Sequence, residues 1–536
     1  MNSQGVRPNF LWISLEDTSP RFGCYGDTVA RTPNIDRLAA GGCIYPNAFS
    51  VAGVCAPSRA AIITGMYPTS IGAHHMRTSH VNELTDGMPT PYDCCPPPYV
   101  KCFTEYLRSA GYFCTNNAKT DYQFSPPRTA WDELGNQGHW RHRADDQPFF
   151  AVFNPTVTHE SGMWPEKRQG PLRTDPTHVE LPPYLPDTLA CREALAQHYD
   201  NLETADQRVG EILDQLEEDG LAENTIVFLW SDHGEGLPRG KRWPYDAGIR
   251  VPLIVRWPNS LPAGSCDQQL VSLIDLGPTL LSLAGATRPQ HLQGQPFLGD
   301  DSAPRDHVFA SRDRHDEAYD RVRAVRDHRY KLIRHHEPQR PYLPWIPYRN
   351  KHPVMQELWR RYAVGSLEGP EELLFQPRPI EELYDTLVDP FEMINLADDA
   401  EYGPILTRLR SSLDGWMRDV GDLGEMSEPQ MVRRWYPDGT QPLTATPMIA
   451  LYDASHPGLA AGVPAPALRS PALAQLQCST EGASIAYTLE SGDDCHWSLY
   501  TQPIRLPAGR LHLRARAIRL GYQESEQLQE RLEVAP

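Results

Sequence analysis

Residues 9–17 read Asn-Phe-Leu-Trp-Ile-Ser-Leu-Glu-Asp, a short apolar run that Pro8 precedes and an acidic pair ends. A run of this length and composition predicts a buried β-strand with Glu16 and Asp17 at its carboxyl end. Similar runs occupy residues 149–153, 226–230 and 253–255, with helical patterns at residues 101–110, 189–216 and 273–283. Because buried strands alternate with helices, we expect an α/β domain with a mostly parallel central sheet covered by helices on both faces.

The chain beyond about residue 304 has a different pattern, which predicts two further units. Residues 322–325 and 330–333 alternate apolar with polar side chains and predict a hairpin of a smaller antiparallel sheet. A Pro/Ala-rich connector begins near Tyr436, and short β-type runs follow it. We therefore expect an α/β domain at residues 1–304, an antiparallel α+β subdomain at 305–435 with a variable insertion at 334–376, and a small β-sandwich-like module at 436–536.

Composition excludes several classes of protein. The chain has 536 residues and a formal net charge of −19, which argues against a nucleic-acid partner because such proteins present a basic face. No stretch approaches the ~20 apolar residues of a membrane span. No apolar segment typical of a signal peptide precedes Phe10, so we expect a cytoplasmic location, or a periplasmic or secreted one if a leader is missing. The eleven cysteines do not form a disulfide framework.

Residues 55–65 read Cys-Ala-Pro-Ser-Arg-Ala-Ala-Ile-Ile-Thr-Gly and predict the start of a helix rich in small residues. The cysteine, the proline at +2 and the arginine at +4 resemble the signature of the type I sulfatases, in the alkaline phosphatase-like superfamily. In that family a maturation enzyme converts the cysteine to formylglycine. Its hydrate has one hydroxyl that attacks sulfur and a second that expels sulfate. The resemblance covers roughly residues 9–400, and it implies this fold and sulfate ester hydrolysis.

Two pairs of polar residues follow predicted strands where sulfatases hold a divalent cation. Glu16 and Asp17 end the first strand, and Asp232 and His233 end the strand at 226–230. Carboxylates at neighbouring strand ends repel each other unless a cation compensates them. The resemblance implies that these four side chains and Cys55 bind calcium. Glu16 replaces the usual aspartate, and His233 replaces the more frequent asparagine. Because imidazole suits transition metals, manganese stays an alternative, as does magnesium.

Basic side chains suited to a sulfate ester occur in the order that the family shows. Arg59 lies one helical turn after Cys55 and therefore on the same helix face. The resemblance implies that Lys119 and Lys241 contact the sulfate and that His159 lies in the active site. A histidine or lysine there could protonate the leaving oxygen.

Five further residues are candidates for binding the rest of the substrate. Asp121 stands where the family commonly has a histidine, and it could recognise a hydroxyl or an amine. His74 and His75 could form the floor of a sugar subsite, although a loop histidine with its own hydrogen bonds is an equal alternative. Arg141 and Arg143 lie in a basic and aromatic segment that suits sulfated or carboxylated sugars, since arginine binds such groups bidentately. A solvated loop is the alternative for this segment.

Three functions fit these patterns. The favoured hypothesis is a sulfatase that hydrolyses a sulfate ester, or an N-sulfate, of a sulfated carbohydrate. The alternative is a phosphonate or phosphate ester hydrolase of the same superfamily, because such relatives use the same nucleophile and an Asp–His metal pair. A non-catalytic glycan-binding protein is the third, and the presence of Cys55, Arg59, both lysines and all metal candidates argues against it.

Overall fold

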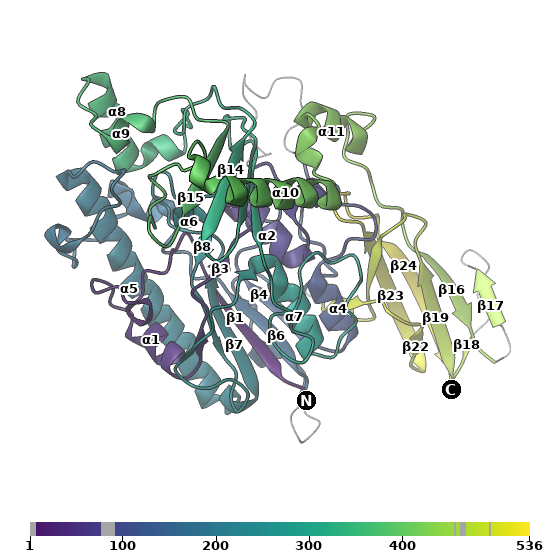
Figure 1. The fold of residues 1–536 in the computed structure, drawn as a ribbon. Helices are drawn as coiled ribbons and strands as arrows, with labels where there is room; N and C mark the ends of the chain where they lie inside the picture. Colours follow the sequence, from purple (N-terminus) through teal and green to yellow (C-terminus); the bar gives the residue numbers. More distant parts are fainter. Residues whose placement is uncertain (1–6, 77–91, 455–456, 461–467, 493–494) are drawn as a thin grey trace.

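The first predicted strand lies near the centre of an eight-stranded sheet (Figure 1). The computed structural model describes residues 7–76, 92–454, 457–460, 468–492 and 495–536. In spatial order the strands are β10 (Ser265–Cys266), β2 (Cys43–Ile44), β9 (Leu253–Arg256), β7 (Thr225–Ser231), β1 (Asn9–Leu15), β6 (Phe149–Phe153), β4 (Phe113–Asn117) and β5 (Glu133–Leu134). β1 pairs in parallel with both β7 and β6. The predicted fold class is confirmed, although β9 is antiparallel to both of its neighbours.

Helices cover both faces of the sheet because side chains of β1 alternate between them. Phe10 and Trp12 belong to the core under α2, α4 and α7, whereas Leu11, Ile13 and Leu15 belong to the core under α1 and α5. These helices are α1 (Pro33–Ala40), α2 (Cys55–Thr64), α4 (Phe103–Ser109), α5 (Leu189–Glu218) and α7 (Leu276–Leu283). Two short helices, α3 (Pro68–Ile71) and α6 (Asp246–Ile249), and a small sheet of β11 (Val271–Ser272), β3 (Ala48–Phe49) and β8 (Arg250–Val251) complete this domain.

An antiparallel sheet follows, made of β12 (Val308–Arg312), β13 (Val322–Arg326), β14 (Tyr330–His335) and β15 (Glu381–Asp385). The long helix α10 (Gly403–Val420) packs its apolar side chains on this sheet. Between β14 and β15 lie α8 (Pro353–Ala363) and α9 (Pro370–Leu373), and apolar residues of α8 join the core around α5. The region that the sequence predicts as an insertion therefore packs back onto the α/β domain.

The C-terminal residues form two facing sheets around a core of their own, joined to the rest after α11 (Glu428–Trp435). One sheet has β17 (Pro457–Ala460), β16 (Met448–Tyr452), β19 (Ala472–Gln477) and β22 (Ile504–Leu506). The other has β18 (Leu468–Arg469), β24 (Leu528–Ala535), β23 (Gly509–Ile518), β20 (Ser484–Thr488) and β21 (Ser498–Leu499). Lys101 Nζ donates to Ser484 Oγ at 2.9 Å, and Arg108 donates to the carbonyl of Trp497 at 2.8 Å. These bonds hold the module against α4.

Two sequence expectations bear on cysteines and membranes. All eleven cysteines lie among the described residues and carry free thiols, as their spacing predicts. In the described part of the chain, no helix combines the length and apolar character that crossing a membrane requires.

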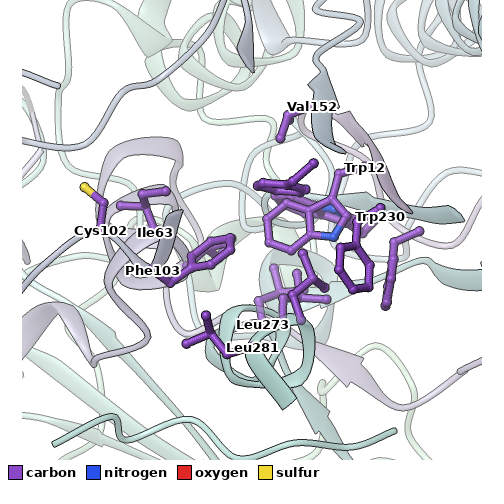
Figure 2. Close-up of a cluster of buried hydrophobic side chains, with 14 of the residues drawn as sticks. Trp12, Ile63, Cys102, Phe103, Val152, Trp230, Leu273 and Leu281 are labelled. Atoms are coloured by element: carbon purple, nitrogen blue, oxygen red, sulfur yellow. The ribbon is translucent and has the colours of Figure 1, made fainter. Parts of the chain in front are cut away.

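Trp12 lies at the centre of the core that β1 forms with α2, α4 and α7 (Figure 2). Its ring centroid lies 4.8 Å from that of Phe150, 5.4 Å from that of Trp230 and 5.5 Å from that of Phe103. This packing joins three strands to α4. It thereby fixes the sheet whose carboxyl edge carries the polar motifs.

We expect Trp12→Ala to lower the free energy of unfolding by about 3–5 kcal/mol, because it leaves a cavity in a packed core. Denaturant midpoints of the variant and the wild type measure the change. Trp345→Ala is the matched control, since that side chain is 57% exposed. Equal midpoints for the two variants would contradict this account of the core.

Candidate active site

Cys55 is the first residue of α2, and the helix leaves its N-terminal N–H groups free at this end. Val54 precedes it in an extended conformation, and no side chain caps the helix. The N–H groups of the first turn can therefore bind an anion beside Cys55. The N–H of Arg242 donates to the carbonyl of Gly53 at 2.5 Å. A Cβ on Gly53 would lie 2.5 Å from the carbonyl oxygen of Trp243, so this close approach of two loops requires glycine.

β1 and β7 bring Asp17 beside Asp232 and His233. Their register pairs Leu15 with Ser231, so the residues that follow each strand emerge side by side. The N–H of Asp17 donates to Asp232 Oδ1 at 3.3 Å. Asp17 has a φ of +47°, in the left-handed region that residues other than glycine seldom adopt. Strain of this kind persists where surrounding contacts impose it, commonly at functional sites.

Four buried donor atoms converge at the start of α2. Cys55 Sγ lies 3.3 Å from His233 Nε2 and 3.9 Å from Asp17 Oδ1. His233 Nε2 lies 3.0 Å from Asp17 Oδ1 and 3.8 Å from Asp232 Oδ1. Such separations suit donors that share one divalent cation at about 2.0–2.6 Å. His233 Nδ1 lies 2.9 Å from the carbonyl of Gly234, which leaves Nε2 for a cation.

Glu16, the other predicted ligand, is directed toward basic side chains. Its Oε1 accepts from Arg59 Nη2 at 3.3 Å and forms an ion pair with Lys119. Arg59 Nε also donates to Asp232 Oδ2 at 2.9 Å. Among the described residues, the groups whose donor atoms lie within 4.8 Å of one another around Cys55 do not include Glu16. In the structure the carboxylate of Glu16 lies beside the donor cluster and pairs with Arg59 and Lys119, and its role as a ligand stays a prediction.

Lys241 contacts the second carboxylate oxygen of Asp17, and His159 has a ring nitrogen within 4.8 Å of donor atoms of both Asp17 and Cys55. Lys241 Nζ donates to Asp17 Oδ2 at 2.7 Å and lies 3.2 Å from His159 Nε2. Burial, followed by the charge of Lys241, lowers the pKa of His159. Burial opposes ionisation of Asp17, but Lys241, His159 and His233 together hold its pKa well below the usual value. Asp17 is therefore an ionised carboxylate inside the protein.

Lys119 reaches the site from the loop that follows β4. Its ammonium lies 3.6 Å from Asp121 Oδ2, and side-chain exposures are 19% for Lys119 and 33% for Asp121. Ala118 and Asp121 have φ values of +75° and +57°. Asn116 Nδ2 donates to the carbonyl of Lys119 at 2.8 Å, which holds this loop beside the end of β4. The predicted neighbours Lys119 and Asp121 therefore border the site on its more open side.

Comparison with known proteins shows the family of this chain. The family model described as Sulfatase matches residues 8–129 and 115–286, and the model N-sulphoglucosamine sulphohydrolase, C-terminal, matches residues 234–344. An ulvan-active sulfatase of Formosa agariphila is 40% identical, over 98% of this chain and 91% of the relative. The chain belongs to the sulfatase family. It is a sulfuric ester hydrolase.

More distant relatives share the fold of this sulfatase. The human N-sulphoglucosamine sulphohydrolase is 28% identical, over 78% of this chain and 91% of the relative. A solved structure of a protein in complex with its substrate D-glucosamine-2-N,6-O-disulfate has a TM-score of 0.53 at 18% identity and covers 78% of this chain and 100% of its own. A phosphonate monoester hydrolase from Silicibacter pomeroyi has a TM-score of 0.56 at 18% identity, covering 78% and 97%. These structural likenesses establish the fold alone.

The two predicted sugar-binding histidines of the sulfatase are buried, and Met76, which follows them, belongs to the same buried cluster as Cys55. His75 Nδ1 accepts from the N–H of Arg314 at 3.2 Å, and its Nε2 lies 4.0 Å from Glu428 Oε2. The ring centroid of His74 lies 4.2 Å from that of His75. His75 contacts Arg314 and Glu428 of the C-terminal subdomain. The role of both histidines in a sugar subsite remains a prediction.

Arg141 and Arg143 are not brought to the active site, which corrects the sequence prediction. Arg141 Nε donates to Asp219 Oδ2 at 2.7 Å, and Asp219 caps α5 just before β7 begins. The guanidinium of Arg143 lies over the ring of Phe149, the first residue of β6, at 5.5 Å from its centroid. Both arginines therefore lie toward the amino ends of the strands, whereas Cys55 lies beyond the carboxyl ends.

Sequence reasoning missed two polar residues that hold the site together. Asn154 directly follows β6, and its Oδ1 accepts from Arg59 Nη1 at 2.9 Å. Glu160 accepts from both terminal nitrogens of Arg242, at 2.9 and 2.7 Å, and its N–H donates to Asp17 Oδ2 at 2.6 Å. A polar residue at the end of a buried strand was the signal used for the metal candidates. The same signal would have identified Asn154.

We expect Asn154→Ala to lower kcat by about 10- to 100-fold, because Arg59 loses a buried acceptor and reacting groups tolerate little displacement. Hydrolysis of an aryl sulfate measures the loss. Arg141→Ala is the control and should stay within twofold of the wild type. Equal losses in both variants would show that Asn154 does not position the site.

Proposed function

We propose that this sulfatase removes sulfate from a sulfated glycan, with Cys55 in its formylglycine form as the nucleophile. The supporting observation is the position of Cys55, whose Sγ lies 3.3 Å from His233 Nε2 at the uncapped start of α2. Hydrated formylglycine would supply one hydroxyl for attack on sulfur and a second for release of sulfate. Cys55 is 1% exposed, so its maturation enzyme would have to act before the chain folds.

The surrounding side chains of this chain orient the ester and receive its charge. Arg59 is fixed by Asp232 and Asn154, and it braces the nucleophile from within the helix. Lys119, which pairs with Glu16, and Lys241, which pairs with Asp17, stabilise the negative charge that develops on the sulfate. We assign protonation of the leaving oxygen to His159. In the free protein, burial and the charge of Lys241 lower the pKa of this imidazole, and the negative charge of a bound sulfate ester would offset both effects.

The balance of charge around Cys55 supports a requirement for a metal. Three cationic side chains of the cluster, Arg59, Lys119 and Lys241, face three carboxylates, those of Glu16, Asp17 and Asp232. Their formal charges cancel, so these side chains alone give no net attraction for an anion. Asp17, Asp232, His233 and Cys55 would hold a divalent cation, which would polarise the sulfate and make the pocket positive. We propose calcium, with manganese or magnesium as the alternatives that the imidazole of His233 permits.

The proposed substrate class is a sulfated glycan such as ulvan. This proposal is supported by the 40% identity with an ulvan-active sulfatase over nearly the whole chain. A phosphonate ester hydrolase is the second candidate. Enzymes of that kind in the superfamily use an Asp–His metal pair, and this chain has His233 where sulfatases more often have asparagine. Release of sulfate from ulvan oligosaccharides, compared with hydrolysis of an aryl phosphonate, separates the two. Faster phosphonate hydrolysis would favour the second candidate.

We expect Cys55→Ala to lower kcat by about three orders of magnitude or more, because a covalent nucleophile is lost. The protein should be produced together with a formylglycine-generating enzyme, and mass spectrometry of the peptide that contains residue 55 identifies the aldehyde. Cys266→Ala is the control, since this exposed cysteine lies outside the site. Near-normal activity of folded, metal-loaded Cys55→Ala would refute the mechanism.

We expect chelation to abolish activity and calcium to restore it at least as well as manganese. Asp17→Asn should weaken calcium binding by more than tenfold, because a ligand charge is lost, whereas Glu16→Gln should change it only a few-fold. Calorimetric titration of each apo protein measures the affinities. An equal loss in both variants would return Glu16 to the ligand set, and better rescue by manganese would change the assigned ion.

A further inference from the structure

Three buried arginines lie near the reaction centre, and part of each guanidinium has no hydrogen-bond partner, although that of Arg312 also lies over the ring of Trp243. Arg242, Arg312 and Arg349 are 3%, 1% and 3% exposed. In the described part of the chain, Arg242 Nε, Arg312 Nη2, and Nε and Nη1 of Arg349 make no hydrogen bond. Buried N–H groups of a charged side chain are costly when they lack an acceptor. A cluster of such groups indicates a site that an acceptor fills.

The three arginines repel one another. Arg312 Nη1 donates to the carbonyl of Arg242 at 3.1 Å, so these two residues are in contact. Burial, then the charges of Arg242 and Arg312, lowers the pKa of Arg349 well below its usual value. Glu160 and Asp316 oppose this change with smaller effects. With Lys241 and Arg378, the cluster has five cationic side chains beside four carboxylates, those of Asp17, Glu160, Asp316 and Asp320, and therefore an excess of positive charge.

The nearby carboxylates are shared between the cluster and other cations. Glu160 forms two hydrogen bonds with Arg242 and also lies 3.3 Å from Lys241 Nζ. Asp320 accepts two hydrogen bonds of 2.9 Å from Arg378 and lies 3.3 Å from Arg312 Nε. The guanidinium N–H groups that point away from these acids therefore have no acceptor. An anion from outside the chain would compensate the excess charge.

The cluster borders the active site on the side of Lys241 and His159. Arg242 is the residue that follows Lys241. The ring of Tyr348, which precedes Arg349, lies 6.4 Å from that of His159. An anion bound by these arginines would thus lie close to a bound sulfate ester.

We propose that Arg242, Arg312 and Arg349 form a subsite for a second anionic group of the glycan. That group is a carboxylate or a further sulfate, on the sugar that carries the scissile sulfate or on its neighbour. Planar guanidinium groups bind such oxyanions through paired N–H donors. This inference rests on the proposed glycan sulfatase activity and adds that the enzyme selects substrates with two anionic groups. A neutral sugar at this position would leave the buried donors unpaired.

The test compares three substrates in wild type and in Arg349→Gln. They are a sulfated, uronate-containing oligosaccharide, the same oligosaccharide with its carboxyl groups reduced, and an aryl sulfate with a single anionic group. We expect Arg349→Gln to lower the ratio of kcat/KM for the intact oligosaccharide to that for the aryl sulfate by about 10- to 100-fold. If the fall persists with the carboxyl-reduced substrate, the second group is a sulfate; if it disappears, the group is a carboxylate.

Lys351→Gln is the matched control, because it removes one positive charge from the same turn at an exposed position and should leave all three rates unchanged. If Arg349→Gln does not fold, the wild type alone decides. It should prefer oligosaccharides with two anionic groups over singly sulfated, carboxyl-reduced ones by at least tenfold. The subsite would be overturned if this kcat/KM ratio in Arg349→Gln stays within twofold of the wild-type ratio. It would also be overturned if the wild type shows no preference for substrates with two anionic groups. Wild type that hydrolyses the aryl sulfate but neither oligosaccharide would instead refute the proposed glycan function.

Discussion

The buried carboxylate of Asp17 is the group on which the arrangement of the reaction centre depends. It accepts hydrogen bonds from Lys241 and from the backbone of Glu160, and its second oxygen lies 3.0 Å from His233 Nε2. A carboxylate without water persists only when such partners compensate its charge. Asp17 thereby links the ends of β1 and β7 to the loops that follow β6 and β7. The left-handed backbone at Asp17 is the conformational cost of those contacts.

The groups around Cys55 and the proposed second subsite have different structural origins. Asp17, Asp232 and Asn154 each follow a strand of the central sheet, so their positions are fixed by strand register. Arg312 ends β12 of the C-terminal sheet, and Arg349 lies in the segment between β14 and β15. Side chains at the end of a packed sheet hold reacting groups more rigidly than loops do. The groups around Cys55 are therefore positioned by the central sheet, whereas the proposed subsite depends on how the C-terminal subdomain packs against it.

The sequence predicted those strands and site residues that a local pattern of apolar and polar side chains determines. β1, β6 and β7 are continuous apolar runs, and the polar residues at their ends mark the active site. β4 was missed because its sequence, Phe-Cys-Thr-Asn-Asn, is half polar. Arg141 was misplaced because nothing in its local sequence says that its loop turns toward Asp219. Arg349 could not be found from sequence, since its significance comes from Arg242 and Arg312, which are distant along the chain and meet only in the folded protein.

The unfilled donors of the three arginines have a physical consequence for selectivity. Their arrangement is built during folding, so binding an anion there requires little further ordering of the protein. A substrate with an oxyanion at this position fills donors that would otherwise be buried without partners. A neutral sugar at this position would exclude water from the guanidinium N–H groups and would supply too few hydrogen-bond acceptors for them. Discrimination then comes from the penalty on the wrong substrate as much as from attraction to the right one. For this reason an acidic protein can select a highly anionic glycan by a few buried charges.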